Sequence, residues 1–433
     1  MNELESTISQ VIEENFIPFE WNDKIEKELE EINLDTNLPR KDLTKIPFIT
    51  IDGADAKDFD DAVHCFKNKT TYSLSVAIAD VAEIVKLKSA INDEALERGT
   101  SIYFPSKVIP MLPEKISNNL CSLVPNEIRN VLVCEINFDL EGDLQSYNFF
   151  EARIKSHQRM TYSEVEEYLN GNSSHLAKNV KKSIDTLYVL TNKLLFKRNK
   201  RQALEIDGQE PLLKMSNDGR VEEITLPKRL FAHQMIEEAM LAANVCAANF
   251  MNKHYKFGVY RIHEEPDNLK LESLKNFFSL KGYSESYKKE ALGIISQCLS
   301  HAKKQQLNKI FQTVVLQSLK RAEYSTKEIG HFGLQLDRYS HFTSPIRRYP
   351  DLMTHRLIKN VLHNGDLALD KDQIEEDCAE MSDLERIAEK SSRQVTQQMI
   401  CYYLKKYIGK EFNAVVTGMA DFGLFAEIDN FYV

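Results

Sequence analysis

The hydrophobic and polar positions divide the chain into a β-rich part followed by a helical part. Between residues 47 and about 157, short runs of β-branched and aromatic residues end at turn residues, which predicts strands in TYSLSVAIADV, VLVCEINFDL and NFFEARI. After residue 160, apolar residues recur at helical spacing. Strands first and helices afterwards are typical of the α+β class. We expect helices over residues 186–196, 231–251, 294–319, 350–363 and 371–407.

The two ends of the chain have patterns of their own. Residues 1–45 are acidic and helix-like, which indicates an N-terminal segment or linker before the first strand. Residues 409–433 alternate apolar and polar side chains around Gly418 and Gly423, as β-hairpins do. At about five to six residues a strand, this stretch holds about three strands, which are too few to close a barrel.

The composition narrows the class of protein but not its activity. The chain has 433 residues and a net charge of −10, which argues against a general nucleic-acid coat but leaves room for a local basic channel. No stretch approaches the roughly 20 apolar residues that a membrane span needs, and the acidic N-terminus does not resemble a signal peptide. The seven cysteines show no CxxC spacing, so we expect buried, reduced thiols. These features predict a cytoplasmic protein with no membrane partner.

A crowd of aspartates follows the first predicted strand, in IPFITIDGADAKDFDDAV (residues 46–63). Two carboxylates about 4 Å apart repel each other by about 4 kcal/mol at an effective dielectric constant near 20, so a converging group favours a bound cation. Oxygen ligands suit Mg²⁺ or Mn²⁺. A calcium EF-hand is excluded, because Gly53 follows the first aspartate and position 12 is Val63; a solvated acidic loop is the alternative. The five aspartates are Asp52, Asp55, Asp58, Asp60 and Asp61.

A second distinctive stretch, YSHFTSPIRRYPDLMTHR, occupies residues 339–356. Pro350 and the aspartate after it begin a periodic run that predicts a helix, which puts Arg347 and Arg348 just before the helix N-terminus. Guanidinium groups and free backbone N–H groups bind anions at such a place; a basic turn that closes a helix cap is the alternative. Ser344 lacks a GxSxG-type elbow, and we expect the histidines here to be packing or capping residues.

The acidic cluster and the arginine pair together fit metal-assisted hydrolysis of a phosphodiester. Five stretches then resemble, in order, the ribonuclease II/ribonuclease R (RNB) family, and are nearer to its ribonuclease R branch: TIDGADAKDFDDAV, VAIADV, RGTSIYFPSKVIPMLPEKISNNLCSL, YRIHEEPD and HFTSPIRRYPDLMTHR. The resemblance runs from about residue 46 to residue 405 and implies an RNB catalytic domain of mixed β-sheets with packed helices. Residues 409–433 resemble the opening of an S1-type OB domain.

The resemblance implies a processive 3′→5′ exoribonuclease that hydrolyses single-stranded RNA to nucleoside 5′-monophosphates. It also implies Mg²⁺ as the cofactor, with Mn²⁺ as the alternative. The four motif aspartates of the family match Asp52, Asp58, Asp60 and Asp61, which leaves Asp55 out. Among them, Asp60 matches the carboxylate that is most sensitive to replacement.

The resemblance also implies contacts with RNA. Arg347 matches the arginine that contacts the scissile phosphate, and we take Arg348 beside it as a further RNA contact. Tyr103, in SIYFP, matches the aromatic residue that stacks on the 3′-terminal base; a tyrosine in the core of a strand is the alternative. We expect a monomer without a small-molecule cofactor.

Some features depart from the family pattern. The two cold-shock OB domains that usually precede the catalytic domain are missing, and the S1-type segment stops after about half of its strands, so we expect a truncated protein or a fragment of a longer one. ALEID (203–207) has Glu205 where the family favours aspartate. A catalytically silent RNA-binding fragment is therefore the alternative to an exoribonuclease. A metal-dependent endonuclease is a third possible function.

Overall fold

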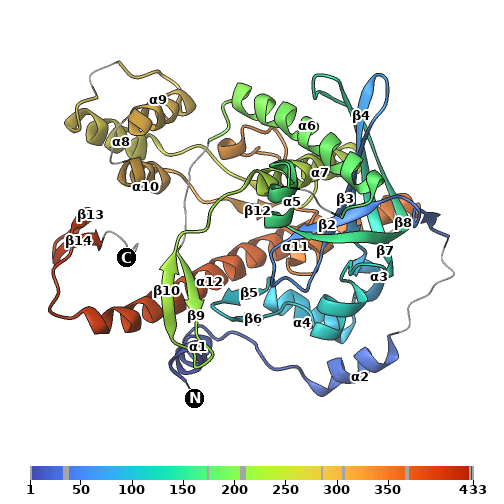
Figure 1. Ribbon diagram of the computed structural model, residues 1–433, viewed down its shortest axis with the longest axis horizontal. Coiled ribbons are helices and arrows are strands. Elements are labelled where there is room, and N and C mark those ends of the chain that lie inside the picture. Colours follow the sequence, from blue (N-terminus) through green and yellow to red (C-terminus); the bar gives the residue numbers. More distant parts are fainter. Residues whose placement is uncertain are drawn as a thin grey trace.

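A six-stranded sheet occupies the right-hand part of the molecule in Figure 1. The computed structural model describes residues 2–32, 39–172, 175–204, 211–283, 286–304, 308–365, 370–428 and 431. The strand order is β1-β8-β2-β3-β4-β7. The last strand of this order, β7, is also hydrogen-bonded to β8, which lies beside β2. β8 is parallel to β1 and β2, whereas the other neighbouring strands are antiparallel. The strands span Lys41–Asp42 (β1), Phe48–Asp52 (β2), Asp61–Lys67 (β3), Thr71–Ala79 (β4), Ile128–Asp139 (β7) and Leu144–Thr161 (β8).

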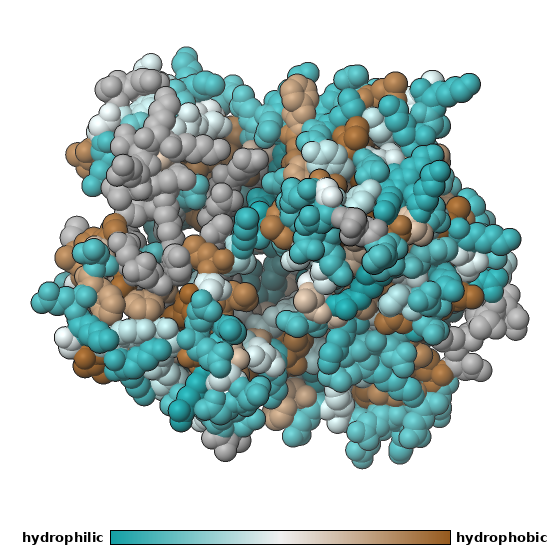
Figure 2. Space-filling view, in the orientation of Figure 1, coloured by the Kyte–Doolittle hydropathy of each residue, from teal (hydrophilic) through white to brown (hydrophobic). Residues whose placement is uncertain are grey.

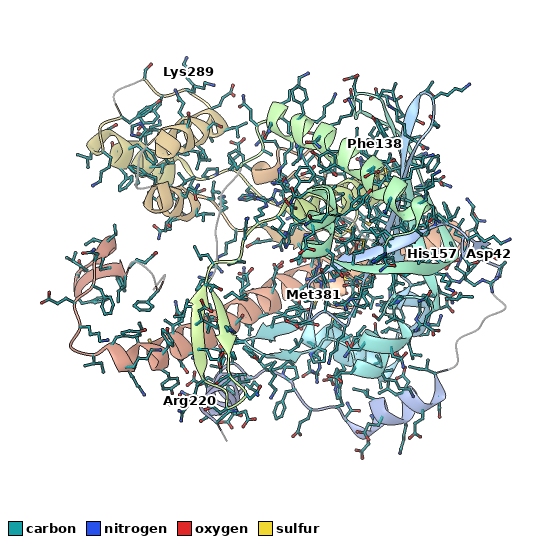
Figure 3. The ribbon with its side chains drawn as sticks, in the orientation of Figure 1. Asp42, Phe138, His157, Arg220, Lys289 and Met381 are labelled. Carbon is teal, nitrogen blue, oxygen red and sulfur yellow. The ribbon has the colours of Figure 1, made fainter. Side chains whose placement is uncertain are left out.

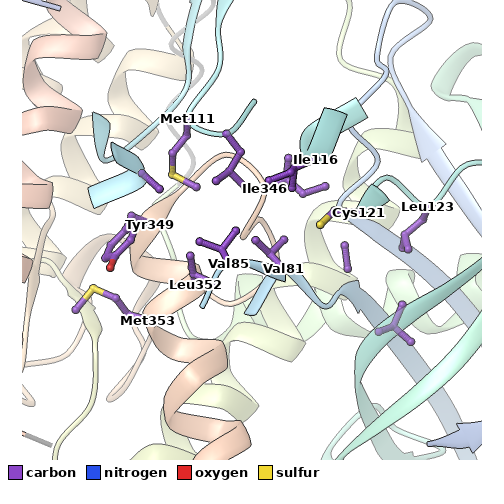
Figure 4. Packing of buried hydrophobic residues seen from close by; sticks show 14 of the residues in the cluster. Val81, Val85, Met111, Ile116, Cys121, Leu123, Ile346, Tyr349, Leu352 and Met353 are labelled. Atoms are coloured by element: carbon purple, nitrogen blue, oxygen red, sulfur yellow. The ribbon is translucent and has the colours of Figure 1, made fainter. Parts of the chain in front are cut away.

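Both faces of this sheet are covered, which explains the unbroken apolar runs in its strands. In β4, every residue after Thr71 is buried. One face packs against α5, α6 and α7, and the other packs against α4 and α11. Figure 4 shows Val81, Ile116 and Leu352 within this second apolar cluster. The helices span Ala90–Arg98 (α4), Tyr162–Leu169 (α5), Lys178–Lys200 (α6), Phe231–Tyr255 (α7) and Tyr349–Leu362 (α11).

The long helix α12 (Lys371–Leu404) runs from beside α11 towards the C-terminal hairpin (Figure 1). It contacts α1, β5, β10 and β12, and Met381 marks it near the centre of Figure 3. Val395 of α12 and Ile8 of α1 are buried in one apolar cluster. The remaining elements in this part are α1 (Glu3–Glu14), α2 (Asp23–Glu31), α3 (Val81–Ile84), β5 (Ile102–Phe104), β6 (Lys107–Ile109), the π-helix η1 (Lys115–Leu120), β9 (Leu212–Met215), β10 (Val221–Thr225), β11 (Tyr260–Ile262), β12 (Glu323–Ser325) and the 3₁₀-helices η2 (Phe332–Leu334) and η3 (Lys405–Tyr407).

Three helices stand apart from the sheet at the upper left of Figure 1, where Lys289 marks them in Figure 3. They enclose a core of their own, in which Phe278 and Phe311 are buried. The prediction of one helix over residues 294–319 is therefore wrong, because α9 ends at Lys304 and α10 packs against it. The apolar spacing continues with one period across both helices, so the pattern alone hides the break. The helices span Asn268–Leu280 (α8), Ala291–Lys304 (α9) and Asn308–Ser318 (α10).

The C-terminal stretch forms a hairpin of β13 (Ala414–Ala420) and β14 (Gly423–Ile428). Phe422 and Leu424 are exposed on it. Of the three strands predicted here, the structure describes two, since residues 429, 430, 432 and 433 lie outside the described part. The assignment of this stretch to an S1-type domain stays a prediction.

The surface and the cysteines can be compared with the expectations from composition. Hydrophilic side chains cover most of the face shown in Figure 2, and no helix in the described ranges is long and apolar enough to cross a membrane. The seven cysteines, all within the described residues, are free thiols. Six are buried, as predicted, but Cys401 near the end of α12 is exposed, because it lies on the other face of the helix from Met399 and Ile400, which are buried in the apolar cluster shared with α1.

A buried ion-pair network ties several elements together beside the sheet. Lys359 of α11 lies 2.7 Å from Asp80 and 2.9 Å from Glu151 of β8. Arg40 lies 2.7 Å from Asp80 and 3.1 Å from Glu83 of α3. Burial would raise the pKa of Asp80, but Lys359 and Arg40 reverse this effect and lower it. The carboxylates are therefore held as charged groups by two cations.

We expect Lys359→Met to lower the free energy of unfolding by about 3–5 kcal/mol, because it leaves buried carboxylates short of a cation. Urea denaturation measures this loss. Lys86→Met is the matched control: Lys86 lies 3.3 Å from Glu83, but its side chain is 62% exposed, and an exposed pair contributes about 1 kcal/mol or less. Equal losses in the two variants would contradict the importance of the network.

Candidate active site

Two loops far apart in the sequence meet at the edge of the sheet. The acidic loop (residues 52–61) joins β2 to β3, and the arginine loop (residues 344–348) precedes α11. The backbone N–H of Ile346 donates to Asp60 Oδ1 at 2.8 Å, and Arg347 Nε lies 3.5 Å from Asp60 Oδ2. Asp60 therefore faces both the backbone and a side chain of the arginine loop.

The strand pairing explains why the acidic loop leaves the sheet. Within the described register, β2 and β3 pair only at Ile49 and Val63. Arg159 of β8 then holds the loop, because its Nη2 donates to the carbonyl oxygens of Gly53 at 3.3 Å and Ala54 at 2.6 Å. The loop is thus tied to the sheet, unlike a simple solvated loop.

Burial and mutual repulsion raise the pKa values of three carboxyl groups in the acidic loop. Burial raises the pKa of Asp52 to about 6, and the charge of Asp58 adds to this effect. Burial raises the pKa of Asp60 to about 8, although Arg347 opposes it. The pKa of Asp61 is held well above its usual range by burial and by the charges of Asp52 and Asp60. These groups therefore resist ionising together unless a cation joins them.

The acidic loop also has spare oxygen atoms for a cation. Asp52 Oδ2 and Asp61 Oδ2 are buried and have no hydrogen-bond partner among the described residues. Such oxygens are costly to bury, and carboxylate oxygens suit a hard ion such as Mg²⁺. With Asp58 and Asp60 nearby, the residues present fit a divalent cation. Asp55 is exposed, which agrees with its omission from the predicted ligands.

A second carboxylate group was missed by the sequence reasoning, because its members lie on separate elements. Asp80, Glu83 and Glu151 bring oxygen atoms within 4.8 Å of one another, a spacing compatible with a metal that the described aspartates of the acidic loop do not reach. Here, however, Lys359 and Arg40 already supply positive charge. Burial alone would raise the pKa values of Asp80 and Glu151. The nearby cations, Lys359 above all, outweigh burial, so both pKa values are lowered. An internal ion-pair network explains this group better than a metal site.

Tyr103 of β5 lies beside the acidic loop. It is 43% exposed, whereas its neighbours Ile102 and Phe104 are each 6% exposed, so the alternative of a core tyrosine is wrong. Its hydroxyl donates to Asp58 Oδ2 at 3.4 Å. Ser392 Oγ of α12 donates to the carbonyl oxygen of Tyr103 at 2.7 Å. The strand is thus fixed against the helix while the aromatic ring stays accessible.

A cavity of about 790 Å³ opens between β5, the arginine loop and α12. Tyr103 and Arg347 line it from one side, and Glu389 and Arg393 line it from α12. The carbonyl oxygen of Arg347 accepts from Ser101 N and from the hydroxyl of the preceding threonine, each at 3.0 Å. These bonds fix the backbone while the Arg347 side chain stays 45% exposed. The cavity therefore combines an aromatic ring with an accessible guanidinium.

Arg348 differs from Arg347 in what it contacts. Its Nη2 donates to Asp351 Oδ1 at 2.8 Å, and most of its side chain is covered. The charge of the Arg348 guanidinium is already matched by Asp351 inside the protein. Its contact with RNA stays a prediction. His341 and His355 both bond to groups of the protein, as expected of packed histidines.

Tyr162 also lies beside the carboxylates and was missed by the sequence reasoning. Thr161 is paired with Asp52 in the parallel register of β8 and β2, so Tyr162 follows at the same edge of the sheet. Its ring stacks on His233, with the ring centroids 4.0 Å apart. Burial, with the charges of Asp61 and Asp52, raises the pKa of its hydroxyl. The hydroxyl therefore stays protonated and can donate a hydrogen bond.

Comparisons with known proteins agree with this geometry. The RNB domain matches residues 40–364. The chain is 37% identical to Ribonuclease R of Vibrio parahaemolyticus, with 96% of this chain and 52% of that protein covered; it spans about half the length of the curated relatives it matches. Its structure is similar to Mycoplasma genitalium RNase R in complex with ribose methylated single-stranded RNA, with a TM-score of 0.94, 32% identity, and 100% of this chain and 69% of that chain covered. Yeast Ssd1, a pseudonuclease, shares the fold at 18% identity and a TM-score of 0.75, with 95% of this chain and 52% of that chain covered.

We expect Mg²⁺ to raise the thermal unfolding temperature more at pH 8 than at pH 6. Without metal, the folded protein has raised pKa values of about 6 for Asp52 and about 8 for Asp60, against about 3.9 for an unperturbed aspartate. These groups therefore favour the fold at low pH, and that contribution is lost as the pH rises from about 4 through the raised values. A bound cation offsets this loss, so its effect grows with pH. Scanning fluorimetry in EDTA or Mg²⁺ measures the difference.

Two substitutions in the acidic loop provide the comparison. Asp61→Asn removes a buried carboxylate and should weaken the response to Mg²⁺. Asp55→Asn is the matched control and should leave the response unchanged, because Asp55 is exposed. A full response in Asp61→Asn would contradict a cation site in this loop.

Proposed function

The chain belongs to the RNB-domain family, and from this premise we propose that it is a processive 3′→5′ exoribonuclease. Its substrate is single-stranded RNA, and attack of water on the terminal phosphodiester releases nucleoside 5′-monophosphates. The meeting of Asp60 with the arginine loop, beside the exposed ring of Tyr103, carries this proposal. The RNA-bound relative from Mycoplasma genitalium supports RNA as the ligand.

Each side chain has a role that suits its surroundings. The accessible ring of Tyr103 stacks on the 3′-terminal base, a contact that any base can make. The exposed guanidinium of Arg347 binds the scissile phosphate and neutralises the charge that develops there during hydrolysis. Asp60 holds the N–H of Ile346 with one oxygen and directs the other towards Arg347. The phosphate contact and the acidic loop are thus kept in one fixed arrangement.

Asp52, Asp58, Asp60 and Asp61 would hold Mg²⁺ in this proposal. The two buried oxygens that lack a partner among the described residues support this ligand set. When bound, the ion supplies Lewis-acid chemistry, which lowers the pKa of a water molecule and neutralises phosphate charge. Mn²⁺ is the alternative, since the same oxygen ligands suit it.

The other expectations from the sequence stay parts of this proposal. They are a catalytic domain over residues 46–405 and an S1-type segment over residues 409–433, preceded by the acidic segment 1–45. They also include a monomer without a small-molecule cofactor and a cytoplasmic location. Glu205, the departure noted in ALEID, lies outside the described residues.

The test of this function is digestion of 5′-labelled single-stranded RNA in Mg²⁺. We expect stepwise shortening to a short end product, with nucleoside 5′-monophosphates identified by chromatography. Asp60→Asn keeps an oxygen for the N–H of Ile346 but removes the charge, so it should lower the rate by at least about 100-fold, the loss typical of one electrostatic contact in a transition state. Asp55→Asn is the matched control and should digest RNA like the wild type.

Other outcomes of this digestion would support the alternatives. Internal fragments early in the reaction would indicate an endonuclease. Intact RNA with retained binding in the wild-type chain would indicate a catalytically silent RNA-binding protein. Equal rates for Asp60→Asn and the wild type would exclude the acidic loop as the catalytic centre.

Substitutions of Tyr103 separate its two contacts. Tyr103→Ala removes the ring and should weaken RNA binding by about 5–150-fold, because stacking on one base contributes about 1–3 kcal/mol. Tyr103→Phe keeps the ring and loses only the bond to Asp58, so it should bind RNA like the wild type but require more Mg²⁺ for half-maximal activity. Fluorescence anisotropy in EDTA measures binding without cleavage. Equal losses of affinity in both variants would argue against stacking.

A further inference from the structure

A buried carboxylate lies behind the arginine loop and has no role in the chemistry described above. Asp351 is in the first turn of α11 and is 0% exposed. Its Oδ1 accepts from the backbone N–H of Ser344 and from Arg348 Nη2, each at 2.8 Å. Its Oδ2 is buried and has no hydrogen-bond partner within the part of the chain that the structure describes.

The two donors that bind Asp351 lie at the two ends of the arginine loop. Ser344 begins the loop and Arg348 ends it, and the carbonyl oxygen of Ser344 also accepts from the backbone N–H of Arg348 at 3.0 Å. Between these ends, Arg347 exposes its side chain to the cavity. The bonds of Asp351 to the two ends therefore set the path of the loop together with the bonds from Ser101 and Thr100 to the carbonyl oxygen of Arg347.

Stability alone does not explain this carboxylate. Burying a charged group is costly, and an oxygen without a donor adds to that cost. A negative charge does favour the first turn of a helix, but an exposed aspartate there has the same benefit, as Asp372 in the first turn of α12 illustrates. The buried position of Asp351 adds a different benefit, because it reaches both ends of the loop at once.

We propose that Asp351 is a positioning residue that sets the place of Arg347 in the cavity, with Arg348 as its internal partner. Asp351 touches neither the substrate nor the reacting atoms, and it acts through the closed loop. Arg348 then serves the loop from inside and is not an RNA contact. This inference rests on the proposed function, since it concerns the phosphate contact of that reaction.

The test compares Asp351→Asn, Arg348→Met and Arg347→Ala in the full chain. Asparagine keeps an oxygen for the N–H of Ser344 and removes the charge that binds Arg348. We expect Asp351→Asn and Arg348→Met each to lower kcat by about 10–100-fold, the effect of a catalytic group displaced by about 1 Å, while KM and the Kd for RNA in EDTA stay within about twofold of the wild type. The double variant, with Asp351→Asn and Arg348→Met together, should have a kcat no lower than that of the slower single variant, because both changes open the same loop.

Folding is followed separately by the thermal unfolding temperature. Asp372→Asn, at the exposed aspartate in the first turn of α12, is the matched control and should leave kcat unchanged. If Asp351→Asn does not fold, Arg348→Met carries the test, because it opens the same bond from the other side.

The outcomes separate the inference from the function. A wild-type kcat in Asp351→Asn, with Arg347→Ala impaired, overturns the role of Asp351 and leaves the exoribonuclease standing. A raised KM and Kd in Arg348→Met would assign Arg348 to RNA binding and also overturn it. A wild-type chain that does not digest RNA in Mg²⁺ would remove the proposed function and this inference together.

Discussion

The hydrogen bond from the backbone N–H of Ile346 to Asp60 Oδ1 joins two loops whose bonded residues are 286 positions apart. A buried carboxylate needs a donor, and a buried N–H needs an acceptor, so each group satisfies the other. Apolar packing brings them together: Phe59, next to Asp60, and Ile346 are buried in the same cluster, in which Figure 4 labels Ile346. The polar site is therefore assembled by the core beneath it.

The contrast between the two carboxylate groups follows from how their charge is matched. Around Asp80, two buried cations outweigh burial and lower the pKa of the carboxyl. In the acidic loop, the accessible Arg347 opposes burial, yet the pKa values of Asp60 and Asp61 stay raised. The fold thus neutralises the first group from within and leaves the second with too little positive charge for all its carboxyl groups to ionise. Only the second has the electrostatics that an external cation would relieve.

The sequence predicted local features of the fold and the site better than their assembly. The apolar run of β4 predicts a strand from the sequence because both faces of that strand are buried. The crowded aspartates and Arg347 are local sequence signals as well. Tyr162 could not be found in this way, because its place depends on the parallel pairing of two distant strands. The difference between Arg347 and Arg348 also depends on the fold, because it is set by which side chain is buried against α11. The break between α9 and α10 was missed because the apolar period continues across it.

The short segment before and within β5 couples the proposed phosphate contact to the proposed stacking contact. Ser101 N donates to the carbonyl oxygen of Arg347 at 3.0 Å, and Tyr103 follows two positions later on the same backbone. Ser392 anchors that backbone to α12. Backbone bonds therefore hold together the two segments that carry the guanidinium and the ring, while Asp60 and Asp58 contact the two side chains themselves. A nucleotide held by both groups would meet the acidic loop in the same register at each step, as repeated removal of single nucleotides from one end requires.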